Sequence, residues 1–244
     1  MLKFFKDNFK YTNDCIILAT PMVLFFIFLQ LYLDTFQYNL SSLASYITFF
    51  LTLWIAISGC FAGWFYMVKK TLQFSKKTFL FDTDRVTALT KLFLCLFKGI
   101  GRFFLKFLSL IVVFFIFLKV IKLITNIIIY NPNLNIRYNT VAIISSIFVF
   151  FISYWVIFWI PEIIYTYTNP FKALINSIKK AYISFESTSI IYIIVCICGF
   201  AIHFSIMNSM EFPLLYFFLL LLSYYFILYT VLLIFRHYEK NFIG

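Results

Sequence analysis

The chain has few of the residues that enzymes and metal centres need. Its 244 residues include nine Asp and Glu together, two His and five Cys. No P-loop, HExxH or GxSxG pattern occurs, and no His and Cys residues show metal-ligand spacing. A nucleophile, a base and a group to orient the base cannot be assembled from this set. We therefore expect no enzymatic activity, no catalytic residues, no cofactor and no metal ion.

The cysteines show no sign of a disulfide framework or a zinc site. Their number is odd, no CxxC pair exists, and all lie in or beside apolar runs: Cys15, Cys60, Cys95, Cys196 and Cys198. The last two are two residues apart, so on a helix they point to different sides. We predict that the cysteines are small buried hydrophobic residues.

Charge is also scarce. Only 12% of the residues are charged, whereas 64% are hydrophobic and the mean hydropathy is +0.97. A soluble domain is closer to half apolar and a quarter charged. No stretch between the apolar runs is long enough for a separate soluble core. The composition predicts one integral membrane domain over residues 1–244, of the all-α class.

Six apolar runs have the length of about 20 residues that a transmembrane helix needs. They cover residues 15–33, 45–68, 104–125, 140–160, 188–207 and 212–235. The first follows Lys3, Lys6 and Lys10, as in a signal peptide, but its 19 residues exceed the roughly 7–15 of an ordinary signal sequence. We expect an uncleaved first span.

The positive charges alternate between the connections. With six spans, 17 of the 20 Lys and Arg fall on one side, and the other side holds only Lys119, Lys122 and Arg137. Cytoplasmic loops collect Lys and Arg, which explains the net charge of +11 without a nucleic-acid partner. This pattern predicts that both termini are cytoplasmic.

Two of the basic connections have the periodicity of amphipathic helices, at residues 84–103 and 169–185. Asp84 and Asn169 are suitable N-caps, and Pro170 suits a first helical position. The matching layout leaves open whether the chain contains two repeated units. Candidate contacts for anionic lipid headgroups are the basic residues Lys91, Lys98, Arg102, Lys106, Lys172 and Lys179.

The second of these helices carries a short motif. Pro170, Ala173 and Ser177 have the Pro-x-x-Ala-x-x-x-Ser spacing, and the last span runs through Arg236 into a short basic tail. In this the chain resembles poorly characterised bacterial six-span proteins, including the membrane domain fused to some glycerophosphodiester phosphodiesterases. The resemblance implies a six-span fold in a bacterial plasma (inner) membrane. No phosphodiesterase domain is present, so it implies no such activity.

Ionisable residues inside the apolar runs are candidates for a polar path. Lys119 and Lys122 lie three apart near one end of the third span, where they either reach the headgroups or line an anion site with Asp34 or Glu211. His203 lies late in the fifth span, either at the interface or in a proton relay.

Glu162 follows Pro161 at the end of the fourth span. It is either a solvated carboxylate at the membrane interface or the partner of Arg236 or of a loop lysine. In the second span, Gly59 and Gly63 form a GxxxG pattern, which favours close helix packing within the bundle or in a dimer. Pro21 in the first span is a possible kink.

The sequence therefore predicts a non-enzymatic multi-pass membrane protein, a scaffold or accessory factor at the cytoplasmic leaflet. Its partners would be anionic lipids, attracted by about 1 kcal/mol for each basic residue near the surface, with a further membrane protein or a second copy as other candidates. The alternative is a small transporter or permease subunit with a polar path near Lys119, Lys122 and His203. A polar cavity lined by those three residues would distinguish it.

Overall fold

The computed structural model describes residues 2–37, 42–73, 82–129, 138–166 and 168–243. Within the helices, only the backbone is described at residues 82–86, 88–89, 117–118, 121–122, 124–129 and 138–145.

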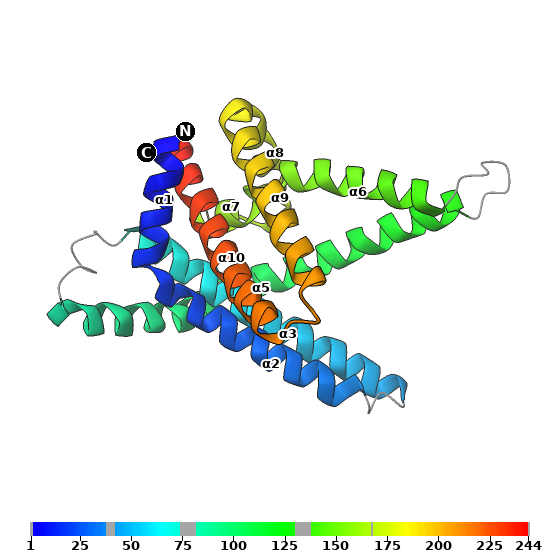
Figure 1. Cartoon of the computed structure of the whole chain (residues 1–244), viewed down its shortest axis with the longest axis horizontal. Coiled ribbons are helices and arrows are strands. Elements are labelled where there is room, and N and C mark those ends of the chain that lie inside the picture. Colours follow the sequence, from blue (N-terminus) through cyan, green and yellow to red (C-terminus); the bar gives the residue numbers. More distant parts are fainter. Residues whose placement is uncertain (1, 38–41, 74–81, 130–137, 167, 244) are drawn as a thin grey trace.

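The described chain is all-α, as predicted, and its helices lie in three long hairpins with short helices at one end (Figure 1). In chain order they are α1 (Leu2–Asp14), the 3₁₀ helix η1 (Ile16–Leu18), α2 (Ala19–Gln37), α3 (Leu43–Gln73), α5 (Asp82–Ile129), α6 (Tyr138–Trp155), α7 (Trp159–Thr166), α8 (Pro170–Ile183), α9 (Phe185–Asn208) and α10 (Pro213–Phe242).

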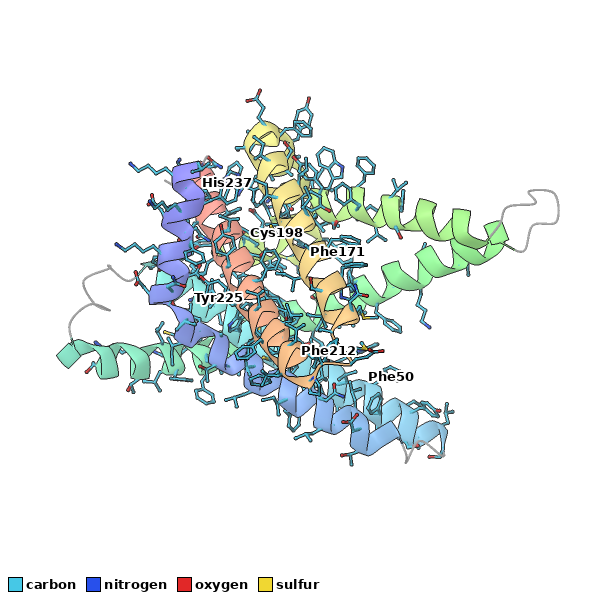
Figure 2. The ribbon with its side chains drawn as sticks, viewed as in Figure 1. Phe50, Phe171, Cys198, Phe212, Tyr225 and His237 are labelled. Carbon is cyan, nitrogen blue, oxygen red and sulfur yellow. The ribbon has the colours of Figure 1, made fainter. Side chains whose placement is uncertain are left out.

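Six helical segments of the described chain are long and apolar enough to cross a membrane. They comprise 16–35, 43–73, 90–116, 146–166, 185–208 and 213–242. Large apolar side chains cover the outside of these segments, among them Phe50 of α3 (Figure 2). The chain is therefore a multi-pass integral membrane protein.

The helix of the third span, α5, differs from its prediction. The amphipathic helix expected at 84–103 and the span expected at 104–125 form one continuous helix, the 48-residue α5. No proline interrupts this stretch, so the backbone hydrogen bonds continue through it. At 1.5 Å per residue α5 is about 72 Å long, more than twice the roughly 30 Å hydrocarbon core of a bilayer. It therefore reaches beyond the core or lies strongly tilted within it.

The hairpins converge toward the end of the bundle that holds both termini, and away from that end they diverge from one another (Figure 1). At the convergent end Phe65 of α3 stacks between Phe107 of α5 and Phe235 of α10, with ring centroids 5.7 and 6.0 Å away. Trp64 is buried beside it, and its indole N–H donates to the Leu18 carbonyl at 2.8 Å. The core of the protein thus lies at this end, and the diverging halves expose apolar side chains.

The first span bends where it enters the bundle. α1 ends at Asp14, η1 makes one turn, and Pro21 is the third residue of α2. Proline is tolerated in the first turn of a helix because its missing N–H would have no helical acceptor there. Pro21 therefore sits at the start of a new helix instead of kinking the middle of the span.

Candidate functional site

A helix break in the fourth span shapes the convergent end. α6 ends at Trp155, and α7 begins at Trp159. Pro161 has no N–H to give to the carbonyl four residues earlier, and its ring crowds that carbonyl, so the helix cannot continue unchanged. The Trp159 N–H donates to the Val156 carbonyl instead of the Trp155 carbonyl. The Trp155 carbonyl is satisfied from outside the helix, by the Ser177 hydroxyl at 3.1 Å.

Ser177 belongs to α8, which lies against this break. The buried face of α8 consists of small residues at helical spacing: Pro170, Ala173, Ser177 and Ala181. Two long side chains tie the helix down at either end. The Trp159 indole N–H donates to the Pro170 carbonyl at 2.8 Å, and the Tyr154 hydroxyl donates to the Ala181 carbonyl at 3.3 Å. The Asn169 side chain accepts from the Phe171 N–H, which is the predicted N-cap.

We expect Ser177→Ala to lower the free energy of unfolding by about 1–3 kcal/mol, because the buried Trp155 carbonyl loses its donor. Thermal unfolding of the purified protein in detergent measures the change. Ser205→Ala is the matched control, since the exposed Ser205 hydroxyl donates only within its own helix, to Ala201. Equal stability of the two variants would show that the Ser177 hydroxyl does not support the break.

The outward face of α8 combines large apolar side chains with lysines. Phe171, Ile175 and Tyr182 are 60%, 55% and 72% exposed and lie within about 40° of each other around the helix. Lys172 and Lys179 are exposed along one edge of this apolar stripe. The amphipathic pattern predicted that the apolar residues of this helix share one side. In the structure the small residues pack inward, Leu174 packs against the core, and Phe171, Ile175 and Tyr182 point outward.

A buried ion pair joins α7, α8 and α10. Glu162 is 1% exposed, and Lys180 donates to its Oε2 at 2.7 Å. Asn176 donates to Oε1 at 2.9 Å, and the Tyr238 hydroxyl also donates to Oε2. Lys180 donates as well to the Tyr238 hydroxyl, at 2.6 Å. The partner of Glu162 is therefore a loop lysine, one of the two partners considered from the sequence, and not Arg236.

Further polar contacts connect this pair to α3. Lys69, at 7% exposure, donates to the Ile164 carbonyl at 2.9 Å near the end of α7 and lies over the Tyr165 ring. The Tyr165 hydroxyl donates to Glu239 on α10 at 2.5 Å. A cation beside the C-terminal carbonyls of a helix interacts favourably with the helix dipole. These contacts hold α7 in place from both sides.

The N-terminal helix α1 packs on α10. Arg236 donates to the Asn8 side chain at 3.3 Å, and Asn8 donates to the Tyr229 carbonyl at 3.2 Å. The Tyr11 hydroxyl donates to the Thr71 carbonyl at 2.9 Å, and burial raises the pKa of this hydroxyl well above its usual range. Burial also raises the pKa of the Cys15 thiol to about 11, so this thiol is protonated and unreactive at neutral pH.

The other cysteines are less enclosed than expected. Cys60, Cys95 and Cys196 are half-buried, and Cys198 is exposed. The prediction of burial is therefore wrong for Cys198, because the fifth span turns this part of its surface outward. All five cysteines are free thiols.

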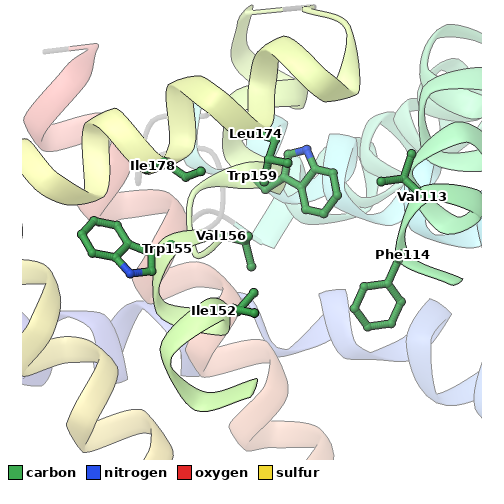
Figure 3. Close-up of a pocket in the computed structure, with 8 residues that line it drawn as sticks. All are labelled: Val113, Phe114, Ile152, Trp155, Val156, Trp159, Leu174 and Ile178. Carbon is green, nitrogen blue, oxygen red and sulfur yellow. The ribbon is translucent and has the colours of Figure 1, made fainter. Parts of the chain in front are cut away.

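An apolar crevice lies between α5 and the broken fourth span, with α8 along its edge (Figure 3). Its volume is about 440 Å³. The α5 wall is formed by Val113 and Phe114, and the facing walls are formed by Ile152, Trp155, Val156, Trp159, Leu174 and Ile178. This volume falls within the roughly 300–1,000 Å³ of small-molecule sites in proteins, and the lining side chains are hydrocarbon or indole. The crevice suits a hydrocarbon ligand.

The candidate headgroup contacts of α5 lie toward its N-terminal end. Lys91, Lys98 and Arg102 are exposed, whereas Lys106 is half-buried, with its ammonium over the Phe103 ring. Seven residues correspond to nearly two helical turns, so Lys106 shares a face of α5 with Val113 in the crevice wall. The basic end of α5 and the apolar crevice are thus aligned along one helix face.

The polar-path candidates whose side chains the structure describes lie on different helices. Lys119 is exposed on α5 over the Phe115 ring, and His203 is exposed on α9. Lys122 is within α5, and its side chain lies outside the described part of the structure, as does the whole of Arg137. Within the residues described, the buried charged groups lie instead at the convergent end of the bundle.

The buried histidine is His237, which the sequence analysis did not select. It is 5% exposed near the C-terminal end of α10 (Figure 2), where its Nε2 lies 3.1 Å from the Thr188 hydroxyl. Asn241 contacts the same ring, and Phe158 stacks on it. These contacts fix α10 against α9. In the described ranges, no three His, Cys, Asp or Glu side chains are grouped to hold a metal ion.

A close helix approach involves one of the two glycines of the GxxxG pattern. A Cβ on Gly63 would lie 2.9 Å from the Leu96 carbonyl oxygen of α5, whereas a Cβ on Gly59 would meet nothing within 4 Å. The facing glycine is Gly99 of α5, where a Cβ would lie 2.8 Å from the Ala62 carbonyl oxygen and 3.0 Å from the Gly63 Cα. The tight crossing of α3 and α5 therefore depends on the pair Gly63 and Gly99.

Comparison with known proteins adds no relative: no protein-family model, no curated protein and no solved structure matches this chain.

Proposed function

We propose that this protein is a non-enzymatic multi-pass membrane protein that binds anionic lipid headgroups at one leaflet and serves there as a scaffold or accessory factor. The observation that carries the proposal is the outward face of α8. Phe171, Ile175 and Tyr182 are exposed large apolar side chains, and Lys172 and Lys179 flank them. A helix of this kind lies in the membrane interface, with its apolar side in the acyl region and its lysines among the headgroups.

The contacts that hold α8 against the bundle give its outward face a fixed orientation. The small buried residues, the Ser177 bond to the helix break and the Glu162–Lys180 pair hold the helix against the bundle. Its apolar stripe is therefore presented at a fixed angle. A preorganised surface binds without the entropic cost of ordering a free helix. We assign α8 and both ends of the chain to the cytoplasmic side of a bacterial plasma membrane, because Lys and Arg collect in cytoplasmic connections.

The resemblance to the membrane domain fused to some glycerophosphodiester phosphodiesterases belongs to the same proposal. Its motif residues Pro170, Ala173 and Ser177 lie on the packed face of α8. In the proteins that the chain resembles, these three residues would keep the helix packed on the bundle, whatever residues form its outward face. A transporter would instead need a polar path, and the exposed positions of Lys119 and His203 offer no support for one.

The double variant Lys172→Gln, Lys179→Gln tests the proposal. In vesicles of phosphatidylcholine and phosphatidylglycerol, spin-labelled lipid held by the protein is distinguished from free lipid by its restricted motion. We expect the wild-type preference for phosphatidylglycerol to fall roughly fivefold for each lysine removed, from about 1 kcal/mol per basic residue. Raised salt should reduce the wild-type preference in the same way.

The control for this experiment is Lys119→Gln, which removes an exposed lysine toward the C-terminal end of α5, away from α8 in the sequence. It should leave the preference close to that of the wild type. An unchanged preference in the double variant would mean that α8 does not recognise lipid charge, and the proposed function would fail.

A further inference from the structure

We propose that the crevice between α5, α6, α7 and α8 is a binding site for one acyl chain of a single anionic phospholipid, whose headgroup lies at Arg102 and Lys106. This inference rests on the proposed function and extends it from a charged surface to a defined site. The depth of the crevice, its fixed walls and the cations beside it identify this occupant.

The depth of the crevice points to lipid. Val113 and Phe114 lie about two turns beyond Lys106 in the apolar run 104–125 of α5, and Ile152, Trp155 and Val156 belong to the membrane-crossing segment of the fourth span. At this depth the surroundings are hydrocarbon, because the bilayer core is about 30 Å thick and contains acyl chains. An acyl chain is therefore the abundant molecule beside the crevice. A soluble ligand would have to leave water to reach it.

The walls are held in place by a hydrogen bond of one lining residue and by contacts outside the crevice. On one side, the Trp159 indole is fixed by its bond to the Pro170 carbonyl, and α8 is held by Ser177. On the other side, α5 is held by its close crossing with α3 at Gly99. The helix break gives the fourth span the bend that separates it from α5 at this level. The fold therefore forms the crevice without a ligand, and an acyl chain would fill it with little rearrangement.

Charge selects the kind of lipid. Arg102, Lys106 and Val113 lie within about 40° of one another around α5, with Lys106 about 10 Å and Arg102 about 16 Å along the axis from Val113. A phospholipid whose chain occupies the crevice would bring its phosphate toward these two cations. Arg and Lys stems lie along apolar surface while their charged groups reach the headgroup layer. An anionic headgroup attracts both cations more strongly than a zwitterionic one does.

Photo-crosslinking of the full-length protein in vesicles tests the site. Two lipids are compared that carry the same mid-chain diazirine, one with a phosphoglycerol and one with a phosphocholine headgroup. Mass spectrometry of the digested protein locates the adducts. We expect adducts at Ile152, Val156 and Leu174 to exceed those at the lipid-facing Ile197 several-fold, with the phosphoglycerol lipid labelling more strongly than the phosphocholine lipid.

Two variants fill the crevice from opposite walls. Ile178→Trp and Val113→Phe should each reduce the crevice adducts several-fold and leave those at Ile197 unchanged. Ile178 is 41% exposed, so the larger ring has room to be accommodated without unfolding the bundle. Ile183→Trp is the matched control, because it makes the same change on the same helix at an exposed position outside the crevice. Lys106→Gln should keep the adducts but remove most of the difference between the two lipids.

The outcomes separate the possible failures. Adducts no stronger in the crevice than at Ile197, or unaffected by both filling variants, would overturn the acyl-chain site. Equal labelling by the two lipids would overturn the assignment to an anionic phospholipid. The variants used here leave Lys172 and Lys179 in place, so a loss of crevice labelling with normal lipid preference at α8 would reject this inference and spare the proposed function.

Discussion

Glu162→Ala is expected to lower the melting temperature of the protein by roughly 6–12 °C, from a loss of about 3 kcal/mol and the 2–4 °C per kcal/mol typical of chains of this size. The carboxylate accepts from Lys180, Asn176 and Tyr238. Removing it leaves a lysine ammonium and two polar groups without their acceptor at the junction of α7, α8 and α10. Thermal unfolding in detergent, followed by circular dichroism, measures the change.

Two comparisons make this prediction specific. Glu211→Ala removes an exposed carboxylate near the α9–α10 turn and should change the melting temperature by no more than about 1 °C. In the double variant Glu162→Gln, Lys180→Met the unpaired charge is gone, so much of the lost stability should return. If Glu162→Ala were as mild as Glu211→Ala, the ion pair would not hold these three helices together.

Gly99→Ala is expected to destabilise the protein by about 1–3 kcal/mol, the usual cost of overpacking a tight core. The added methyl group would lie 2.7 Å from the Tyr66 Cβ, 2.8 Å from the Ala62 carbonyl oxygen and 3.0 Å from the Gly63 Cα. Two of these atoms are backbone and the third is a Cβ fixed to it, so α3 and α5 must separate to relieve the contact. Because this crossing supports one wall of the crevice, acyl-chain labelling should also weaken.

Gly101→Ala is a matched control two residues away. A Cβ at Gly101 meets nothing within 4 Å, so the same change there should stabilise the helix by up to about 1 kcal/mol through its higher helix propensity. Gly59→Ala should behave in the same way. The two groups of variants should therefore shift the melting temperature in opposite directions. A stabilising Gly99→Ala would mean that the two helices do not approach as closely as the structure shows.

The amphipathic pattern of the chain predicted helices at the right places but not their context. Residues 84–103 are helical, as their periodicity predicted, but the periodicity does not show whether the helix ends before the next apolar run. It continues, because no residue between 82 and 129 breaks the backbone hydrogen bonds. For α8 the N-cap and Pro170 gave the start of the helix correctly. The side that packs was not predictable, because small residues such as Ala173 carry little hydropathy signal while Phe171 carries much.

The sequence indicated some of the site residues and missed others. Glu162 was noticed because a carboxylate beside an apolar run is costly to bury alone, and a loop lysine was one of its two expected partners. Gly99 was not noticed, because the GxxxG pattern pointed to Gly59, and the matching glycine lies on a different helix. His237 was passed over for His203, because position within an apolar run does not reveal which face of the helix is buried. Each miss concerns a contact between segments far apart in the sequence.

The sequence by itself determined the class of this protein. Apolar runs of membrane length and scarce charge predict helices in a bilayer. In hydrocarbon, the backbone N–H and C=O groups of each apolar segment must form hydrogen bonds within that segment. What only the tertiary structure decided is where these helices meet. The Gly63–Gly99 crossing, the break before Pro161 and the Glu162–Lys180 pair bring distant residues together, and packing of this kind depends on shape complementarity that hydropathy does not encode. The apolar crevice and the outward face of α8, on which both proposals rest, follow from these contacts.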